Sequence, residues 1–120
     1  MKILYAASEA VPFCKTGGLA DVAGSLPAAL AAQGADVAVV LPLYQKVKEK
    51  FSDQLHFECY DYVDLAWRHS YCGLFSMERD GVTWYFLDNE QYFRRPGLYG
   101  YMDDGERFGF FSRAVVRMLP

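Results

Sequence analysis

The stretch Lys15-Thr16-Gly17-Gly18-Leu19-Ala20-Asp21 decides the expected fold. It follows an apolar run at residues 3–7 and precedes an Ala/Leu-rich segment that ends at Gln33-Gly34. A strand, a glycine turn and a helix N-terminus in this order present backbone N–H groups and the positive end of a helix dipole to an anion. We therefore predict a phosphate site at this turn, with Lys15 as a mobile cation.

The motif has a second interpretation on physical grounds alone. Two glycines and a lysine match neither the dinucleotide-binding GxGxxG fingerprint nor the P-loop pattern. A flexible turn with a solvated Lys15 explains the same residues. Asp36, which stands at the start of the second expected strand instead of after it, argues against a dinucleotide-dependent oxidoreductase.

Composition indicates one globular domain. The 120 residues are 52% hydrophobic and 22% charged, with a net charge of -3, which argues against a general nucleic-acid or anionic-membrane surface. The N-terminus is too short and too acidic for a signal peptide, and no apolar stretch has membrane-spanning length. Three dispersed cysteines and two histidines predict no disulfide framework and no metal site, so we expect a cytoplasmic protein.

A β-α-β unit is expected around the glycine turn. Residues 2–7 and 35–43 form apolar runs typical of strands buried on both faces of a parallel sheet, and we place the first strand centrally. Between them, apolar residues recur at helical spacing until Gly34. Pro27 interrupts this pattern, so we expect either a kink near Gly24 or a helix capped by Ser25, with Asp21 in the first turn.

The middle of the chain changes to antiparallel signals. Residues 44–51 form a charged connection with about one helical turn, and 56–65 alternate as a half-exposed strand. Residues 70–77 and 82–87 flank Asp80-Gly81, a strong hairpin signal. Cys59 and Cys72 are expected to be reduced and buried.

The last third combines a loop and a helix. Residues 88–104 lack periodicity and carry Arg95 and Tyr99, candidates for contact with a sugar, although any single tyrosine is equally expected to pack into the core. Asp103 or Asp104 caps the final helix, which we expect to end at Pro120. The apolar face expected for this helix consists of Phe108, Phe111, Val115 and Met118. The arginines expected to lie off that face are Arg107, Arg113 and Arg117.

Several spaced motifs resemble one known family. Ser8-Glu9 with Pro12, the segment 15–22, Leu26-Pro27, Leu41-Pro42 and the later run Arg95-Pro96-Gly97-Leu98-Tyr99-Gly100 are similar to the N-terminus of bacterial and plant glycogen or starch synthases. The resemblance implies a Rossmann-like α/β parallel sheet with an inserted antiparallel β-hairpin. It also implies that residues 1–120 are an incomplete N-terminal, acceptor-side domain of a two-domain glucosyltransferase of the glycosyltransferase B (GT-B) type.

The resemblance also implies a function. In this family the lysine of the motif binds ADP-glucose, and glucose is added with retention to the non-reducing end of an α-1,4-glucan, without a metal or another cofactor. The implied substrate-binding residues are Lys15, Gly17, Gly18 and Asp21, with Arg95 and Tyr99 as further candidates. Which of Arg94 and Arg95 points into a cleft stays open, and the choice of ADP-glucose over UDP-glucose rests on the resemblance alone.

Two other functions remain as alternatives. One is a non-catalytic glucan-binding module built on the tyrosine-rich loop, and the other is a nucleotide-dependent Rossmann-like oxidoreductase. No catalytic residue is identifiable in these 120 residues, and we expect the segment alone to be inactive.

Overall fold

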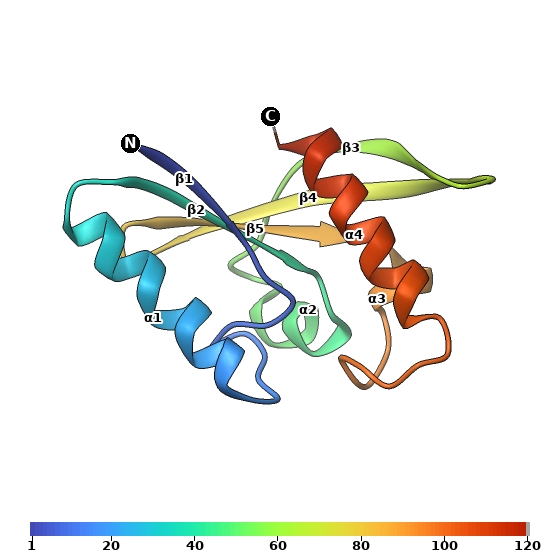
Figure 1. The fold of residues 1–120 in the computed structure, drawn as a ribbon, viewed down its shortest axis with the longest axis horizontal. Helices are drawn as coiled ribbons and strands as arrows, with labels where there is room; N and C mark the ends of the chain where they lie inside the picture. Colours follow the sequence, from blue (N-terminus) through green and yellow to red (C-terminus); the bar gives the residue numbers. More distant parts are fainter. Residues whose placement is uncertain (120) are drawn as a thin grey trace.

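A five-stranded mixed sheet with the strand order β1-β2-β5-β4-β3 organises the protein, whose computed structural model describes residues 1–119. Helix α1 packs against β2, and α4 packs against β3 (Figure 1). The elements in chain order are β1 (Lys2–Ala6), α1 (Gly18–Ala32), β2 (Asp36–Pro42), α2 (Gln45–Phe51), β3 (His56–Leu65), β4 (Arg68–Arg79), β5 (Val82–Asp88), α3 (Glu90–Phe93) and α4 (Asp104–Met118).

The parallel part of the sheet consists of β1, β2 and β5. β1 pairs with β2, and β2 pairs with β5, both in parallel. The β-branched and aliphatic residues of β2 suit a strand that is covered on both faces, and Val39, Val40 and Leu41 are fully buried. The predicted β-α-β unit is therefore confirmed for β1, α1 and β2.

The central position expected for β1 is wrong within residues 1–119. β1 lies at one end of the strand order, and its residues alternate between exposed and half-buried. Leu4 is 44% exposed. An apolar run specifies a strand, but the order of strands in a sheet depends on pairing between distant segments, which the run does not encode.

The predicted hairpin forms, with a different role in the sheet. β4 and β5 pair antiparallel around Asp80 and Gly81, whose φ angles of 54° and 75° are those of a tight hairpin turn. Because β5 also pairs in parallel with β2, the inserted antiparallel part consists of β3 and β4. Cys72 is buried, but Cys59 is exposed, because β3 is an edge strand whose residues 56–60 are all exposed.

α1 is one helix with Pro27 inside it. Ser25 does not cap a second helix, because its hydroxyl donates to the Asp21 carbonyl within α1 at 2.9 Å. Gly17 is the N-cap residue, and Asp21 lies in the first turn as predicted. The loop before α1 packs closely on the helix, since the Val11 N–H donates to the Ala20 carbonyl at 3.0 Å.

The remaining helices depart from expectation in detail. α2 is longer than one turn, and α3 forms within the segment expected to be an irregular loop. Arg107 is fully buried on α4, although we expected it off the apolar face. Asp103 precedes α4 without a side-chain capping bond, and Pro120, expected to end this helix, lies outside the described residues.

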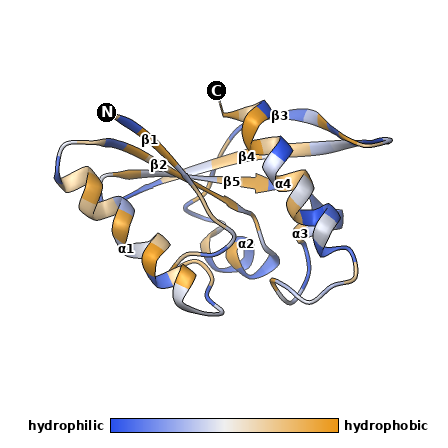
Figure 2. Cartoon of the chain, viewed as in Figure 1, coloured by the Kyte–Doolittle hydropathy of each residue, from blue (hydrophilic) through white to orange (hydrophobic). Residues whose placement is uncertain are grey.

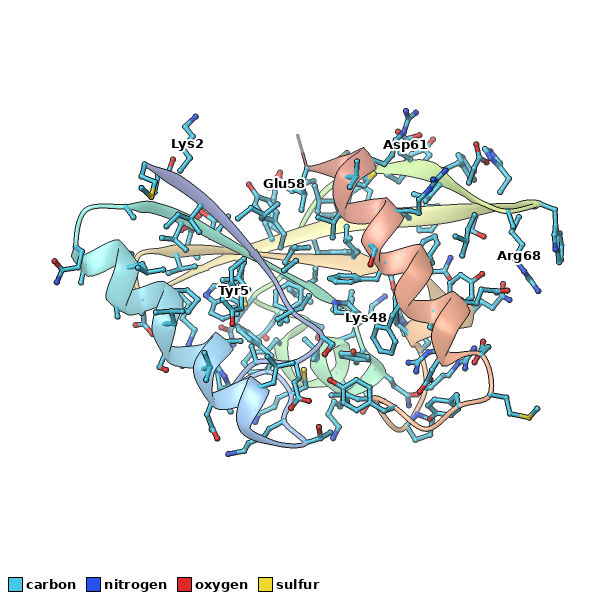
Figure 3. The ribbon with its side chains drawn as sticks, viewed as in Figure 1. Lys2, Tyr5, Lys48, Glu58, Asp61 and Arg68 are labelled. Carbon is cyan, nitrogen blue, oxygen red and sulfur yellow. The ribbon has the colours of Figure 1, made fainter. Side chains whose placement is uncertain are left out.

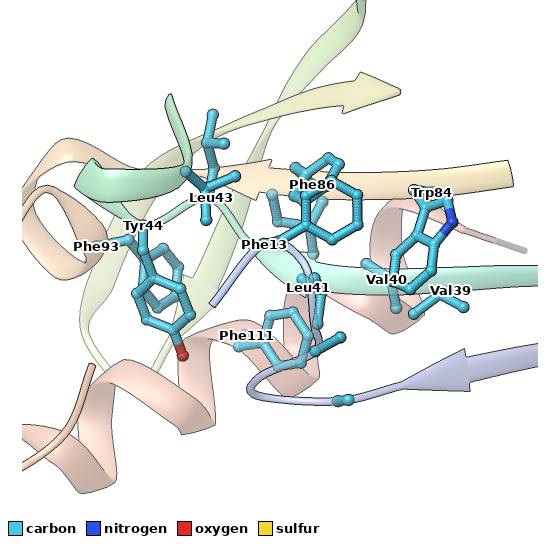
Figure 4. Packing of buried hydrophobic residues seen from close by; sticks show 14 of the residues in the cluster. Phe13, Val39, Val40, Leu41, Leu43, Tyr44, Trp84, Phe86, Phe93 and Phe111 are labelled. Carbon is cyan, nitrogen blue, oxygen red and sulfur yellow. The ribbon is translucent and has the colours of Figure 1, made fainter. Parts of the chain in front are cut away.

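The core lies between the sheet and the segments that follow β1 and β2. The Phe13 ring packs 4.8 Å from Trp84 and 5.1 Å from Phe86, measured between ring centroids (Figure 4). The Phe51 ring lies 4.9 Å from Phe13. In the hydropathy colouring, β1, β2 and β5 are mostly hydrophobic, whereas β3 and the helices mix hydrophobic and hydrophilic residues (Figure 2). Among residues 1–119, no helix has the length and apolar character needed to cross a membrane.

Candidate functional site

The candidate site lies where β1 and β2 end. Ser8 and Glu9 follow β1, and Tyr44 follows β2. The Tyr44 hydroxyl donates to the Ser8 carbonyl at 2.7 Å, so the two strand ends are joined directly. In open α/β sheets, ligands bind at this carboxyl edge. Three labelled residues lie away from this edge: Lys2 at the amino end of β1, Asp61 on β3 and Arg68 on β4 (Figure 3).

Lys15 and Asp21 form an exposed ion pair beside the glycine turn. The Lys15 ammonium donates to both Asp21 carboxylate oxygens, at 2.7 and 2.8 Å. The two side chains are 50% and 57% exposed. An ammonium has three N–H donors, so the third remains for a ligand at the open side of the turn.

The glycine turn is accessible from outside. Gly18 is exposed and Gly17 is half-buried, and a Cβ added at either position would meet nothing within 4 Å. The N–H groups of Gly18 and Leu19 are the first two of α1 and form no hydrogen bond with any residue in the described range. Two unpaired N–H groups at the start of a 15-residue helix can receive an anion.

Glu9 is a central residue of the site that the sequence prediction did not include among the binding residues. Its side chain is buried, and its carboxylate accepts four hydrogen bonds, two on each oxygen. Oε1 accepts from Thr16 Oγ1 at 2.6 Å and from Tyr99 Oη at 2.7 Å. Oε2 accepts from the N–H groups of Thr16 and Gly17 at 2.7 and 3.1 Å. The Gly17 N–H expected to bind a phosphate therefore binds Glu9.

The hydrogen bonds keep Glu9 ionised. Burial raises the pKa of Glu9, but the bonds from Thr16, Tyr99 and Gly17 outweigh it and lower the pKa to about 2. One sequence signal was present, since Glu9 stands three residues after β1, at the start of the loop that leads to the glycine turn. The sequence does not show which loop supplies the donors.

Tyr99 is brought to the site from the loop between α3 and α4. Its hydroxyl lies 2.7 Å from Glu9 Oε1 and 2.6 Å from Ser8 Oγ. Because ionised Glu9 only accepts, the Tyr99 proton goes to Glu9, and Ser8 Oγ donates to Tyr99. Burial and the bond to Glu9 raise the pKa of Tyr99 to about 12, so its hydroxyl keeps its proton at neutral pH.

Arg95 contacts neither the glycine turn nor Lys15 within residues 1–119. Its guanidinium donates to both Asp103 oxygens, at 2.6 and 2.7 Å, and lies over the Tyr101 ring. Arg94 pairs with Asp88 at 3.2 Å. Both arginines of the pair therefore hold protein carboxylates, and in this structure Arg95 orders the loop that carries Tyr99.

Arg107 supports the same loop from α4, and its spacing on the helix gave no sign of this. The fully buried guanidinium donates to the carbonyls of Tyr92 and Leu98, at 2.7 and 2.9 Å, and to Asp104 at 2.8 Å. An arginine placed among backbone carbonyls fixes the path of a loop. Tyr99 follows Leu98 directly, so Arg107 helps to set its position.

The site is suited to anion binding. It offers one exposed ammonium, two N–H groups at a helix start and a rigid support made by Glu9 and Tyr99. Within residues 1–119, no cluster of three or more His, Cys, Asp or Glu side chains is placed to hold a metal ion. Together, the parallel strands and this turn define a Rossmann-like α/β domain with an anion-receptive glycine turn.

Comparisons with known proteins give the family. The sequence profile of the starch synthase catalytic domain matches residues 2–120. The chain is 56% identical over 119 residues to the glycogen synthase of Caldicellulosiruptor bescii and 51% identical to that of Lactobacillus acidophilus, in each case covering 99% of this chain and 25% of the relative. The chain belongs to the starch synthase catalytic domain family, and it spans about a quarter of the length of these relatives.

A solved structure supports the same assignment. The catalytic domain of starch synthase IV from Arabidopsis thaliana, bound to ADP and acarbose, matches with a TM-score of 0.81 and 26% sequence identity. The match covers 97% of this chain and 24% of that protein. The fold is thus the corresponding part of a glycosyltransferase B-type catalytic domain.

Proposed function

We propose that the full-length protein is a glycogen or starch synthase that transfers glucose from ADP-glucose to the non-reducing end of an α-1,4-glucan with retention. Residues 1–120 form part of its N-terminal, acceptor-side domain, and a second domain supplies the rest of the cleft. The reaction takes place in the cytoplasm without a metal or cofactor, and the 120 residues alone are inactive.

The observation that carries this proposal is the open turn between β1 and α1. Lys15 bonds to Asp21 in the first turn of α1 and keeps one spare N–H donor, and the first two N–H groups of this helix, those of Gly18 and Leu19, have no partner among residues 1–119. Departure of a nucleoside diphosphate leaves negative charge on its phosphates, and fixed donors and cations stabilise that charge. The ADP bound to the related Arabidopsis enzyme makes an adenosine diphosphate donor the preferred choice over UDP-glucose.

Each proposed binding residue has a distinct part in this scheme. Lys15 contacts the donor phosphates, Gly17 and Gly18 allow close approach of the backbone, and Asp21 holds the Lys15 ammonium in place. Tyr99 is 39% exposed, and its accessible part contacts the glucan. Arg95 acts indirectly, by ordering the loop that bears Tyr99.

Replacing Lys15 with Gln in the full-length protein tests the proposal. The loss of one charge-assisted hydrogen bond predicts a KM for ADP-glucose that is about 10- to 100-fold higher. Lys2→Gln is the matched control, because Lys2 lies at the opposite end of β1, and it should leave the kinetics unchanged.

The alternative functions give different results. Unchanged donor kinetics in Lys15→Gln, together with impaired glycogen binding, would favour the non-catalytic glucan-binding module. Tight binding of a nicotinamide or flavin dinucleotide, measured by titration of the wild-type protein, would favour the oxidoreductase. Either result would overturn the proposed function.

A further inference from the structure

We propose that Glu9 is a positioning residue that couples the conformation of Tyr99 to the donor-binding turn of Lys15 to Leu19. This inference rests on the proposed function, because it assigns a role in donor binding to a residue that itself does not touch the donor. It adds a link between the loop that bears Tyr99 and the turn that bears Lys15.

The first step of the argument is the saturation of the Glu9 carboxylate. A carboxylate offers about four acceptor positions, and the four donors from Thr16, Gly17 and Tyr99 fill them. All four donors are neutral, and Lys15 is engaged with Asp21 instead. The buried charge therefore depends on two separate segments, the turn and the loop, being in place at the same time.

The second step concerns the direction of the turn. Two successive N–H groups, those of Thr16 and Gly17, point inward to Glu9 Oε2. The next two, those of Gly18 and Leu19, are then left for the open side. By accepting hydrogen bonds from the Thr16 and Gly17 N–H groups, Glu9 orients the turn so that the Gly18 and Leu19 N–H groups can bind a ligand.

The third step is the rigidity of the loop behind Tyr99. Arg107 holds the Leu98 carbonyl, the Tyr101 hydroxyl accepts from the Gly97 N–H at 2.9 Å, and Arg95 holds Asp103. Tyr99 is therefore presented to Glu9 by a fixed support. A displacement of its hydroxyl withdraws one of four donors from Glu9 and loosens the hold on Thr16 and Gly17.

A double-mutant cycle in the full-length enzyme tests this coupling, with the Kd for ADP-glucose measured by calorimetry in the absence of glucan. Glu9→Gln replaces one acceptor oxygen with an N–H₂ group that faces two donors, and we expect about 10-fold weaker binding. Tyr99→Phe keeps the ring and removes one donor, and we expect about 3- to 10-fold weaker binding. In the double variant, the Tyr99→Phe change should add less than about 2-fold.

The control is Tyr60→Phe, because Tyr60 is 59% exposed on β3 and its hydroxyl bonds to no described residue. It should leave the Kd unchanged. If Glu9→Gln fails to fold, Thr16→Val takes its place in the cycle, since it removes only the hydroxyl donor at 2.6 Å.

The outcomes separate the coupling from the proposed function. An unchanged Kd in Tyr99→Phe, or effects of the two substitutions that multiply, would overturn the coupling. If Lys15→Gln weakens ADP-glucose binding while Glu9→Gln does not, the coupling fails and the proposed function stands. If Lys15→Gln has no effect, the proposed function itself fails.

Discussion

The ion pair between Lys15 and Asp21 yields a sharp prediction for the variant Asp21→Asn. In the structure the carboxylate takes two of the three ammonium N–H donors, at 2.7 and 2.8 Å, and leaves the third beside the glycine turn. An amide oxygen accepts one of these bonds, and the amide N–H₂ group cannot accept the other. Lys15 then regains rotamer freedom that donor binding must remove again.

The magnitude follows from the exposure of the pair. With side chains that are 50% and 57% exposed, the pair contributes at most about 1 kcal/mol, because solvent screens it. That free energy corresponds to about a 5-fold change in an equilibrium constant. We therefore expect kcat/KM for ADP-glucose to fall about 2- to 5-fold in Asp21→Asn, and the difference from wild type to shrink as salt is added.

Steady-state kinetics with ADP-glucose varied at saturating glycogen measure this effect. Asp36→Asn is the control, since Asp36 is an exposed residue at the start of β2, and its kinetics should match those of the wild type. An unchanged kcat/KM in Asp21→Asn would refute the reasoning, because it would show that Asp21 does not position Lys15. An improved kcat/KM would also refute it, because it would show that Asp21 competes with the donor for Lys15.

Two further predictions concern stability. The pKa of Glu9 in the folded protein, about 2, lies below its ordinary value of 4.5. The ionised carboxylate therefore stabilises the fold by about 3 kcal/mol above pH 4.5, and this stabilisation is lost as the pH falls towards 2. The difference in Tm between wild type and Glu9→Gln should narrow over that pH range, and a constant difference would contradict this role of Glu9. Gly24→Ala places a Cβ 2.7 Å from the Val11 carbonyl oxygen and should destabilise the protein by about 1–3 kcal/mol, measured as a lower Tm in a thermal melt. Gly105→Ala is the control, because its Cβ would enter open space, and it should not lower Tm.

The sequence predicts the local elements because their signals are local. The apolar run of β2 and the Asp80-Gly81 turn each specify a structure through propensity and backbone geometry. The position of β1 and the parallel pairing of β5 with β2 depend on contacts between distant segments. These contacts carry no signature within either segment, so the strand order was not predictable from the patterns alone.

The candidate site shows the same division. The placement of Lys15, Gly18 and Asp21 at one turn was predictable because a strand, a turn and a helix follow one another within about twenty residues, and their role in binding stays a prediction. Glu9 and Tyr99 are 90 residues apart in the chain, and their bond exists only once the loop before α4 folds back. Arg107 was misjudged because helical spacing identifies a face of the helix, whereas its burial depends on carbonyls from a separate loop.

The central claim is that the Lys15 ammonium faces the phosphates of a sugar nucleotide at the turn between β1 and α1. A crystal structure of the full-length protein with ADP-glucose measures this directly, as the distance from Lys15 Nζ to the nearest phosphate oxygen. We predict a distance of about 2.7–2.9 Å, typical of a charge-assisted hydrogen bond, with Asp21 still in contact. A bound donor whose phosphates lie out of hydrogen-bonding reach of Lys15 would contradict the claim.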